Sequence, residues 1–384
     1  MAEPLRVLEL LVSTEPGGGP AHVLDLATRL PRDEFDFTVA GPEGAYAGRL
    51  RDSCGAFVNI AADRLSLGSF VAVRRLIGER GIELVHSHGK GAGLYGRLAA
   101  RRAGIPSIHT FHGIHYARYP VGLRGLYLAL ERRLAAIGTA VIHVSESQAR
   151  EAEALRLAPA GRTHVIVNGV DVAGLTAKAE PRQAARAALG LADDELGIGI
   201  VARLDPIKAI DVLLEAFARV ARALPRARLI VIGDGPEAGR LHALTRSLGI
   251  DSRVRFTGAI PDAARLLGGL DLYVSASRRE GLSLAVLEAM ALGLPVVATR
   301  VAGHVDAVSD GVTGRLVATD EPRALADALV SLLGEPAAAR RALGEAGRRR
   351  VEQRFGAERM AAETAALYRA VARFQEGKSS TSSV

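Results

Sequence analysis

The chain has 384 residues, 48% of them hydrophobic and 4% aromatic, and its formal net charge is +7. This length suits two domains better than one, and the absence of tryptophan argues against aromatic platforms that stack single-stranded nucleic acid. The basic balance favours anionic partners such as phosphates, nucleotides or acidic lipid surfaces.

Targeting and redox signals are few. Cys54 is the only cysteine, so a disulfide framework and a thiolate metal cluster are excluded. Residues 1–13 lack the basic segment and cleavage site of a signal peptide, and no window approaches 18 uninterrupted apolar residues. The sequence therefore predicts a soluble cytoplasmic protein, with peripheral contact at a membrane left open.

Short apolar runs alternate with helical patterns along the chain. In the first half the runs cover residues 5–11, 35–41, 56–61, 82–88, 106–113, 139–145 and 163–169; in the second half they cover 197–204, 227–235, 253–258, 271–277, 295–299 and 313–318. Such alternation predicts α/β architecture with parallel sheets covered on both faces. Because these strands are too many for one doubly wound sheet, we expect two facing Rossmann-like domains with a cleft between their strand-end loops.

The break between the domains is expected where the pattern weakens, within residues 172–196. We therefore predict an N-terminal domain over residues 1–173 and a C-terminal domain over 174–358. A helix is predicted over 359–376, and the polar tail 377–384 is expected to be disordered.

A glycine-rich loop, GGGP at 17–20, follows the first predicted strand and precedes a helical pattern. Glycines let the backbone approach a ligand, and N–H groups at a helix N-terminus bind anions. Gly18 and Gly19 are therefore candidates for ligand contact, against the alternative of an ordinary strand-to-helix turn. His22 follows within the first helical turn.

A second glycine motif, GAGLYG from Gly91 to Gly96, matches the dinucleotide fingerprint G-x-G-x-x-G. That fingerprint needs an acidic residue about 20 positions further on to hold the ribose hydroxyls. Residues 97–130 contain no aspartate or glutamate. We interpret these glycines as helix-packing residues and not as a nicotinamide site.

Histidines gather at His86, His88, His109, His112 and His115. Imidazole is a common metal ligand, but no carboxylate lies near them in the sequence and the spacing matches no standard zinc pattern. No metal site is predicted. His112 lies where the chain leaves a strand, so it is a candidate hydrogen-bonding group.

The stretch from Lys90 to Arg133 holds eight basic residues against Glu131 alone. Clustered Lys and Arg attract anionic lipid by about 1 kcal/mol each. A solvated basic face and a patch for an anionic membrane both remain open.

In the second half, Arg203 ends a predicted strand and Lys208 follows five residues later. Arginine offers paired donors and lysine a point charge, and together they suit a diphosphate. Ordinary surface charges are the alternative.

The segment from Glu280 to Gly293 reads as a loop and a helix that begins near Ser283. Val286 stands where a capping box would have glutamate, so first-turn N–H groups are left for an anion. Glu280 and Glu288 can bracket one extended ligand by accepting hydrogen bonds from its hydroxyls, since buried carboxylates without partners are costly.

Together these residues resemble a retaining GT-B glycosyltransferase of family 4, the bacterial glycosyltransferase group 1. The resemblance covers nearly the whole chain. It is carried by GGGPAH, by NGVD at 168–171, by the Arg203/Lys208 pair, by GDGP at 233–236, by VRFTG, and by the two glutamates in EGLSLAVLEAMALGLPVVAT.

The resemblance implies a role for each matching residue. The implied catalytic residues are Arg203, Lys208, His112 and Glu280. The implied donor contacts are Gly18 and Gly19 under the diphosphate, the main chain at the strand end near Arg255 and Phe256 around the base, the backbone of Gly281, Leu282, Ser283 and Leu284, and Glu288 at the ribose. His22, His88 and Lys90 fall on the acceptor side, and the C-terminal helix is expected to cross back onto the first domain.

The implied reaction transfers a hexosyl or N-acetylhexosaminyl group with retention from a nucleotide sugar, in the first place a UDP-sugar. The leaving phosphate would accept the acceptor proton, and neither a metal ion nor another cofactor is expected. Members similar to this chain act on polyprenyl-diphosphate-linked sugars in cell-surface polysaccharide assembly. A small soluble acceptor, a GT-B sugar-nucleotide epimerase and an inactive binding module are the alternatives.

Overall fold

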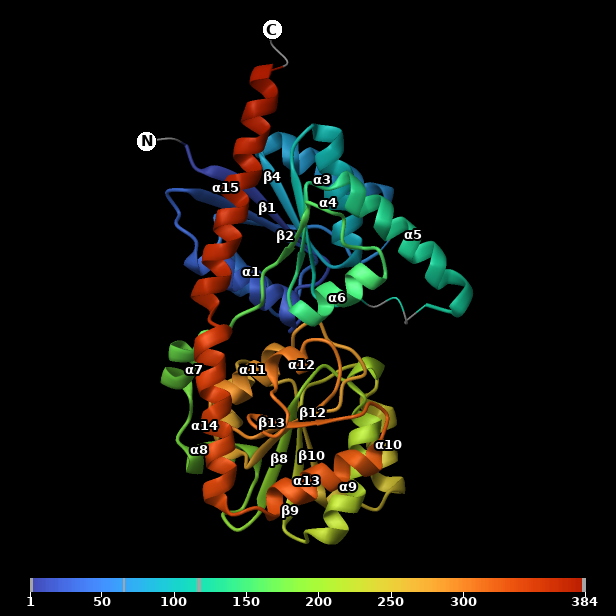
Figure 1. Cartoon of the computed structure of the whole chain (residues 1–384), viewed down its shortest axis with the longest axis vertical. Coiled ribbons are helices and arrows are strands. Elements are labelled where there is room, and N and C mark those ends of the chain that lie inside the picture. Colours follow the sequence, from blue (N-terminus) through green and yellow to red (C-terminus); the bar gives the residue numbers. More distant parts are fainter. Residues whose placement is uncertain (1–2, 65, 115, 117–118, 382–384) are drawn as a thin grey trace. The chain divides into compact units, whose positions relative to one another are not determined.

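The computed structural model describes residues 3–64, 66–114, 116 and 119–381. The chain divides into two compact units, each built on one parallel sheet (Figure 1). Unit 1 comprises Met1–Asn168 and Ala357–Val384, and unit 2 comprises Gly169–Gly356.

The sheet of unit 1 has seven strands in the order β3-β2-β1-β4-β5-β6-β7. They are β1 (Leu5–Leu11), β2 (Phe35–Gly41), β3 (Ala56–Asn59), β4 (Leu84–His88), β5 (Ser107–Phe111), β6 (Ala140–His143) and β7 (Thr163–Val165). Every residue of β4, β5 and β6 is buried, as expected for strands covered on both faces.

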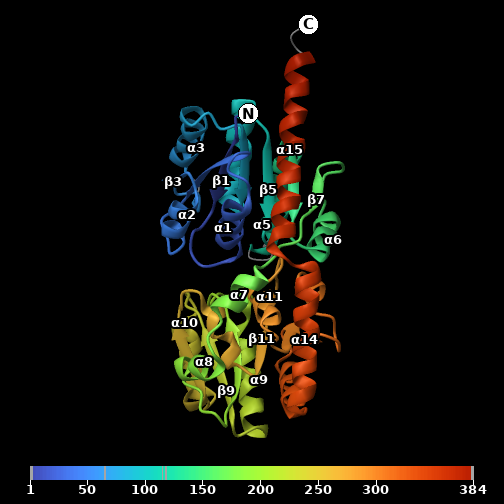
Figure 2. The same ribbon diagram turned by 90° about the vertical axis from the view of Figure 1, so that its left-hand side faces the viewer.

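Seven helices belong to the described part of unit 1. They are α1 (Gly18–Arg29), α2 (Ala47–Ser53), α3 (Leu67–Glu79), α4 (Lys90–Ala103), α5 (Val121–Ile137), α6 (Glu146–Ala154) and α15 (Ala357–Thr381). Figure 2 shows α15 running alongside unit 1, and its Met360 and Tyr368 are buried in the same core as Phe35 of β2.

Unit 2 has six strands in the order β10-β9-β8-β11-β12-β13. They are β8 (Leu196–Val201), β9 (Ala227–Ile232), β10 (Val254–Gly258), β11 (Leu272–Ser275), β12 (Val296–Thr299) and β13 (Gly314–Val317). Its α-helices are α7 (Val172–Lys178), α8 (Arg182–Leu189), α9 (Ile210–Ala223), α10 (Ala238–Ser247), α11 (Leu284–Ala291), α12 (His304–Ala307), α13 (Pro322–Gly334) and α14 (Ala337–Arg354), and the 3-10 turns are η2 (Pro206–Lys208), η3 (Asp251–Arg253) and η4 (Ala263–Gly269).

All thirteen predicted strands are confirmed, in two parallel sheets. The boundaries of the units differ from the prediction. Unit 1 ends at Asn168, whose N–H donates to Val144 O at 3.1 Å, and the predicted weak region forms α7 and α8 of unit 2. The last helix starts two residues earlier than predicted and runs to Thr381, so residues 377–381 are helical and not a disordered tail.

The glycines of GAGLYG lie at or near the start of α4 and pack closely, as predicted. A Cβ on Gly91 would lie 1.9 Å from Ala62 O, and one on Gly96 would lie 3.0 Å from Ser87 Cβ. The motif therefore brings α4 against its neighbours.

Within the described residues, no helix has the length and apolar character needed to cross a membrane.

Candidate functional site

Each sheet reverses its strand order once, between β1 and β4 in unit 1 and between β8 and β11 in unit 2. In open α/β sheets, ligands bind beyond the carboxyl ends of the strands at such a switch point. Most of the predicted site residues follow these strands or their neighbours, so each unit brings a group of them to this edge.

In unit 2 the loops after β8 and β11 meet through an ion pair. Lys208 ends the turn η2, and its Nζ lies 2.6 Å from Glu280 Oε1. Ser277 Oγ donates to the same oxygen at 2.7 Å. The side chain of Glu280 is only 10% exposed. The structure thus joins two predicted catalytic residues that lie far apart in the sequence.

The carboxylate of Glu280 is held in its ionised form. Burial alone would raise its pKa, but the nearby charges of Lys208 and His304 and the hydrogen bond from Ser277 outweigh burial, and the pKa is lowered. An ionised carboxylate only accepts hydrogen bonds. Glu280 can therefore bind hydroxyl donors such as those of a sugar.

Two glycines allow the loops of unit 2 to approach one another. Gly303 has φ +77°, and a Cβ there would lie 2.4 Å from Gly281 O. Gly233 of GDGP has φ +143°, and its Cβ would lie 1.9 Å from Ala202 O. The loop that carries Glu280 and the loop that follows β8 are thus each backed by a glycine that no other residue could replace without a shift of the backbone.

The N-terminus of α11 follows the Glu280 loop. Ser283 is its N-cap residue and makes no side-chain cap hydrogen bond. Leu282 and Ser283 are buried, and Glu288 lies half-buried in the second turn. Such a terminus has N–H groups available to an anion.

Two predicted arginines differ in position. Arg203 is exposed just after β8, near the switch point. Arg255 lies within β10, which runs to Gly258 as the predicted run 253–258 does. The guanidinium of Arg255 lies against Gly190, at the end of α8. The expected contact of this segment with the base is made by the main chain, so it stays a prediction.

In unit 1 the histidines form a buried network around a carboxylate from β1. Glu9 Oε2 lies 2.7 Å from His88 Nε2, and His88 Nδ1 lies 3.0 Å from His112 Nε2. Tyr368 of α15 donates to Glu9 Oε1 at 2.6 Å. His22 joins the group with its ring centroid 5.1 Å from that of His112.

A carboxylate that is distant in the sequence lies beside the histidines in space. Glu9 pairs with His86 in the register of β1 and β4 and is fully buried. The signal was available, since a glutamate in the apolar run 5–11 has to find a partner inside the protein. Tyr368, 359 positions away from Glu9, carried no comparable signal.

Burial and mutual contact determine which members of the network carry a charge. Burial lowers the pKa of His22 to about 3 and that of His88 to about 4, and it lowers that of His112 well below its ordinary value. Burial opposes ionisation of Glu9 too, but contact with His86 and His88 outweighs it and lowers the Glu9 pKa. The carboxylate is thus ionised at neutral pH beside the neutral imidazoles of His22, His88 and His112.

Glu9, His86 and His88 each have an atom within 4.8 Å of the others and form a geometrically possible metal group. Their donor atoms are already engaged, however. His86 contacts Tyr368 and Thr110 through its two ring nitrogens, and His88 contacts Glu9 and His112. A metal ion would have to break these hydrogen bonds. His115, the remaining member of the sequence cluster, lies outside the described residues.

The predicted acceptor-side residues have different surroundings. His88 is 1% exposed and bonded at both nitrogens, so it contacts other side chains and is not itself open to an acceptor. The Lys90 ammonium lies 4.5 Å and 4.6 Å from the ring centroids of Tyr119 and Tyr127. Gly19 lies next to the His112 ring.

One ion pair of the basic stretch is buried, which leaves the net positive charge of the stretch unchanged. Arg97 is fully buried in α4, and its NH2 group lies 2.7 Å from Glu131 Oε2. This pair removes one positive and the only negative charge from the surface.

Comparison with known proteins identifies the class. Residues 16–173 match the family model "Glycosyltransferase Family 4" and residues 195–335 match "Glycosyl transferases group 1". The crystal structure of Anabaena Alr3699/HepE in complex with UDP and glucose has a TM-score of 0.84 and 23% identity, and the match covers 95% of this chain and 100% of that one. The fold is therefore that of the GT-B glycosyltransferases.

Relatives with similar sequences are also named as glycosyltransferases. D-inositol 3-phosphate glycosyltransferase 2 of Catenulispora acidiphila is 34% identical over 306 residues, which are 74% of this chain and 70% of that protein. A Bacillus subtilis protein named as glycosyltransferase EpsD is 31% identical over 317 residues, with 80% of this chain and 82% of that protein covered. The chain belongs to glycosyltransferase family 4, and it is a glycosyltransferase by class.

Proposed function

We propose that this enzyme transfers a sugar with retention of configuration from a UDP-sugar to an acceptor hydroxyl. The observation that carries the proposal is the Lys208–Glu280 pair, held at 2.6 Å beyond the carboxyl ends of β8 and β11. The positive charge of Lys208 can stabilise a leaving phosphate, and the carboxylate of Glu280 can accept hydrogen bonds from sugar hydroxyls. UDP as the leaving group is supported by the UDP complex of the Anabaena protein.

In this mechanism Lys208 and Arg203 neutralise the charge that develops on the diphosphate, and the N–H groups at the start of α11 add a partial positive charge. Glu280 orients the sugar. Glu9 is the ionised carboxylate of the unit 1 network, but Tyr368 and His88 occupy its two oxygens. Glu9 is therefore not available as a base or nucleophile, and in the proposed mechanism the departing phosphate takes the proton of the acceptor hydroxyl. No metal ion enters this scheme.

The test of the donor is UDP binding by the purified protein in the presence of a chelator. Ligand at about 100 times its dissociation constant adds roughly 2.7 kcal/mol to the free energy of unfolding. We expect UDP to raise the melting temperature without metal, and NAD to leave it unchanged. Stabilisation by NAD alone, or a UDP effect that disappears with the chelator, would reject the corresponding part of the proposal.

Glu288→Ala is expected to weaken UDP binding by about 10- to 100-fold, because a hydrogen bond to a charged group contributes about 1.5–3 kcal/mol. Glu288 lies half-buried in the second turn of α11, where it would accept from the ribose hydroxyls. Isothermal titration with UDP measures this loss. Glu321→Ala, at the N-cap position of α13 in the same unit, is the control. Equal affinities for wild type and Glu288→Ala would remove the ribose role.

For the acceptor we propose a hydroxyl on a polyprenyl-diphosphate-linked sugar, with the enzyme at the cytoplasmic face of an anionic membrane. The support is a surface of unit 1, the α3–α5 surface, on which α4 packs against both other helices. It carries seven of the eight exposed large hydrophobic residues found among the described residues: Leu67, Val71, Leu98, Val121, Leu123, Leu126 and Leu130.

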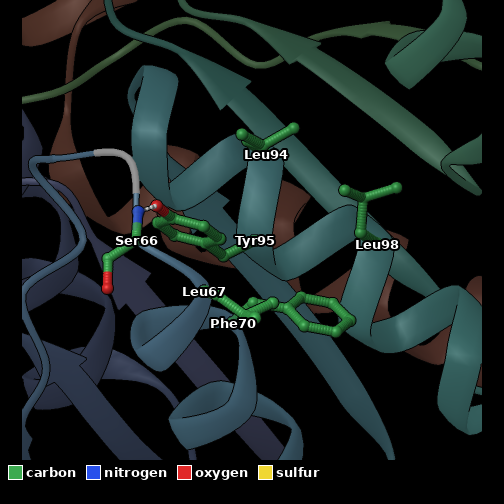
Figure 3. A pocket seen from close by; sticks show the side chains of 6 residues that line it. All are labelled: Ser66, Leu67, Phe70, Leu94, Tyr95 and Leu98. Carbon is green, nitrogen blue, oxygen red and sulfur yellow. Dashed lines mark hydrogen bonds between the residues drawn. The ribbon is translucent and has the colours of Figure 1, made fainter.

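Between α3 and α4 this surface has an open pocket of about 380 Å³ (Figure 3). Leu67, Phe70, Leu94 and Leu98 line it, and the Tyr95 hydroxyl accepts from Ser66 N and is therefore not left for a ligand. The same helices carry exposed arginines: Arg74, Arg75, Arg101, Arg102, Arg132 and Arg133. Exposed apolar side chains among basic ones match the acyl chains and head groups of anionic lipid.

Leu123→Asn/Leu126→Asn is expected to lower binding to phosphatidylglycerol vesicles by at least about 10-fold, since burying one leucine contributes about 1.5–3 kcal/mol. These side chains are 51% and 69% exposed on one face of α5. Co-sedimentation measures the change. Val312→Asn is the matched control, because Val312 is 59% exposed in unit 2. Failure of the wild type to bind these vesicles would exclude the membrane contact.

A small soluble acceptor is the second candidate, and the relative named D-inositol 3-phosphate glycosyltransferase 2 favours it. Transfer of sugar to inositol phosphate in detergent-free solution, without lipid, would replace the lipid-linked acceptor with this one.

A further inference from the structure

Glu9 determines the order of protons in the buried network of unit 1. It lies in the middle of β1 and is fully buried. Its Oε1 accepts from the Tyr368 hydroxyl and its Oε2 lies 2.7 Å from His88 Nε2. A carboxylate can only accept. His88 must therefore carry its proton on Nε2.

The position of the proton on His88 then determines the position of the proton on His112. A neutral imidazole has one N–H and one lone pair, and burial lowers the pKa of His88 to about 4. Because Nε2 of His88 is protonated, its Nδ1 is the nitrogen with the lone pair. It lies 3.0 Å from His112 Nε2, so His112 must donate from Nε2. The Nδ1 atom of His112 is then a lone pair, and no described residue hydrogen-bonds to it.

We propose that Glu9, acting through His88, is a positioning residue that fixes His112 as the Nε2–H tautomer, so that the Nδ1 lone pair accepts a hydrogen bond from a substrate hydroxyl. The hydrogen bond from a substrate hydroxyl to His112 rests on the proposed glycosyl transfer. The tautomer rests on the contacts of unit 1 alone.

His22 supports the same reading of the site. Its Nδ1 lies 3.0 Å from Asn168 Oδ1, which accepts, so Nδ1 carries the proton. Its Nε2 is then a second buried lone pair without a partner among the described residues. With two imidazole lone pairs on neighbouring rings, this edge of the sheet suits hydroxyl donors and disfavours a phosphate.

Glu9→Gln reverses the order with almost no change of shape. The amide oxygen can still accept from Tyr368, and the NH2 group then faces His88 Nε2 and donates to it. His88 then donates from Nδ1 to His112 Nε2, so the proton of His112 lies on Nδ1 and this atom becomes a donor. Tyr368→Phe is the matched control. It removes another member of the network but keeps the carboxylate, so His88 and His112 keep their tautomers.

The first readout is nitrogen-15 NMR of histidine-labelled full-length protein without substrate, since protonated and unprotonated imidazole nitrogens resonate far apart. We expect an unprotonated Nδ1 on His112 in the wild type and in Tyr368→Phe, and a protonated one in Glu9→Gln. A protonated Nδ1 in the wild type overturns the proposal even if the Glu9→Gln variant does not fold.

The second readout is kinetic, with the UDP-sugar on which the wild type is active. Glu9→Gln should lower kcat/KM by about 10- to 100-fold more than Tyr368→Phe, while the affinity for UDP alone stays unchanged. Equal losses in the two variants would make Glu9 merely structural. A wild type that transfers no sugar would reject the proposed function, and the NMR result would still decide the tautomer.

Discussion

Lys208→Ala is expected to lower kcat by about 10²- to 10³-fold, because it removes a preorganised charge from the position where the leaving diphosphate becomes negative. In the structure the ammonium is fixed by Glu280 Oε1 at 2.6 Å and by its place in η2. It therefore needs little reorganisation when the bond to the sugar breaks. The measurement is the rate of UDP release at saturating donor, with and without acceptor.

The same substitution leaves the Glu280 carboxylate without its cation in a site that is 10% exposed. Breaking a buried pair costs about 3–5 kcal/mol, so activity has to be compared at a temperature where both proteins are folded. Lys208→Ala/Glu280→Gln removes the stranded charge and should recover stability without recovering turnover. Lys178→Ala, exposed at the end of α7, is the control. Wild-type turnover in Lys208→Ala would refute the mechanism.

The strands were predictable because each is a short β-branched apolar run with a turn signal after it, and parallel strands need no alternation of polar residues. The domain boundary was harder. The last hydrogen bond of Asn168 to unit 1 and the docking of α7 on α11 are tertiary contacts, and local composition around residue 172 reports neither.

Much of the candidate site of unit 2 could be predicted from the sequence because Glu280, Ser283 and Glu288 lie close together in one segment. The extent of β10 also followed from its sequence, since the predicted run 253–258 ends at Gly258 as the strand does. In unit 1 the burial of Arg97 and the network between Glu9 and Tyr368 arise from pairing of distant segments. A sequence shows that a charge exists but not which partner neutralises it.

Acid is expected to unfold unit 1 in a window set by its buried histidines. Burial lowers the pKa of His22 to about 3 and the pKa values of His88 and His143 to about 4, from an ordinary 6.5. Below pH 6.5 the unfolded chain therefore binds more protons than the folded one, and the free energy of unfolding falls as the pH falls. Each group contributes up to about 1.4 kcal/mol per pH unit.

These three groups alone give up to about 4 kcal/mol per pH unit, against a total stability of about 5–15 kcal/mol. Burial also lowers the pKa values of His109 and His112, which add to the slope. The carboxylates Glu9 and Glu280 act at lower pH. Their pKa values are lowered from 4.5, so their contribution is complete above that value and is lost only as the pH falls below it. Between pH 6.5 and 4.5 the loss of stability therefore reports the histidines.

Calorimetry from pH 7 to pH 5 measures this slope, and His143→Gln should reduce it by up to about 1.4 kcal/mol per pH unit, whatever it does to stability at pH 7. His143 is fully buried at the end of β6. An unchanged melting temperature from pH 7 to pH 5 would mean that these imidazoles take up protons in the folded protein over the same range as in the unfolded chain. Glu9 would then face imidazolium groups at pH 5, and the single-proton order by which it fixes His112 would be lost over this range and not only at lower pH.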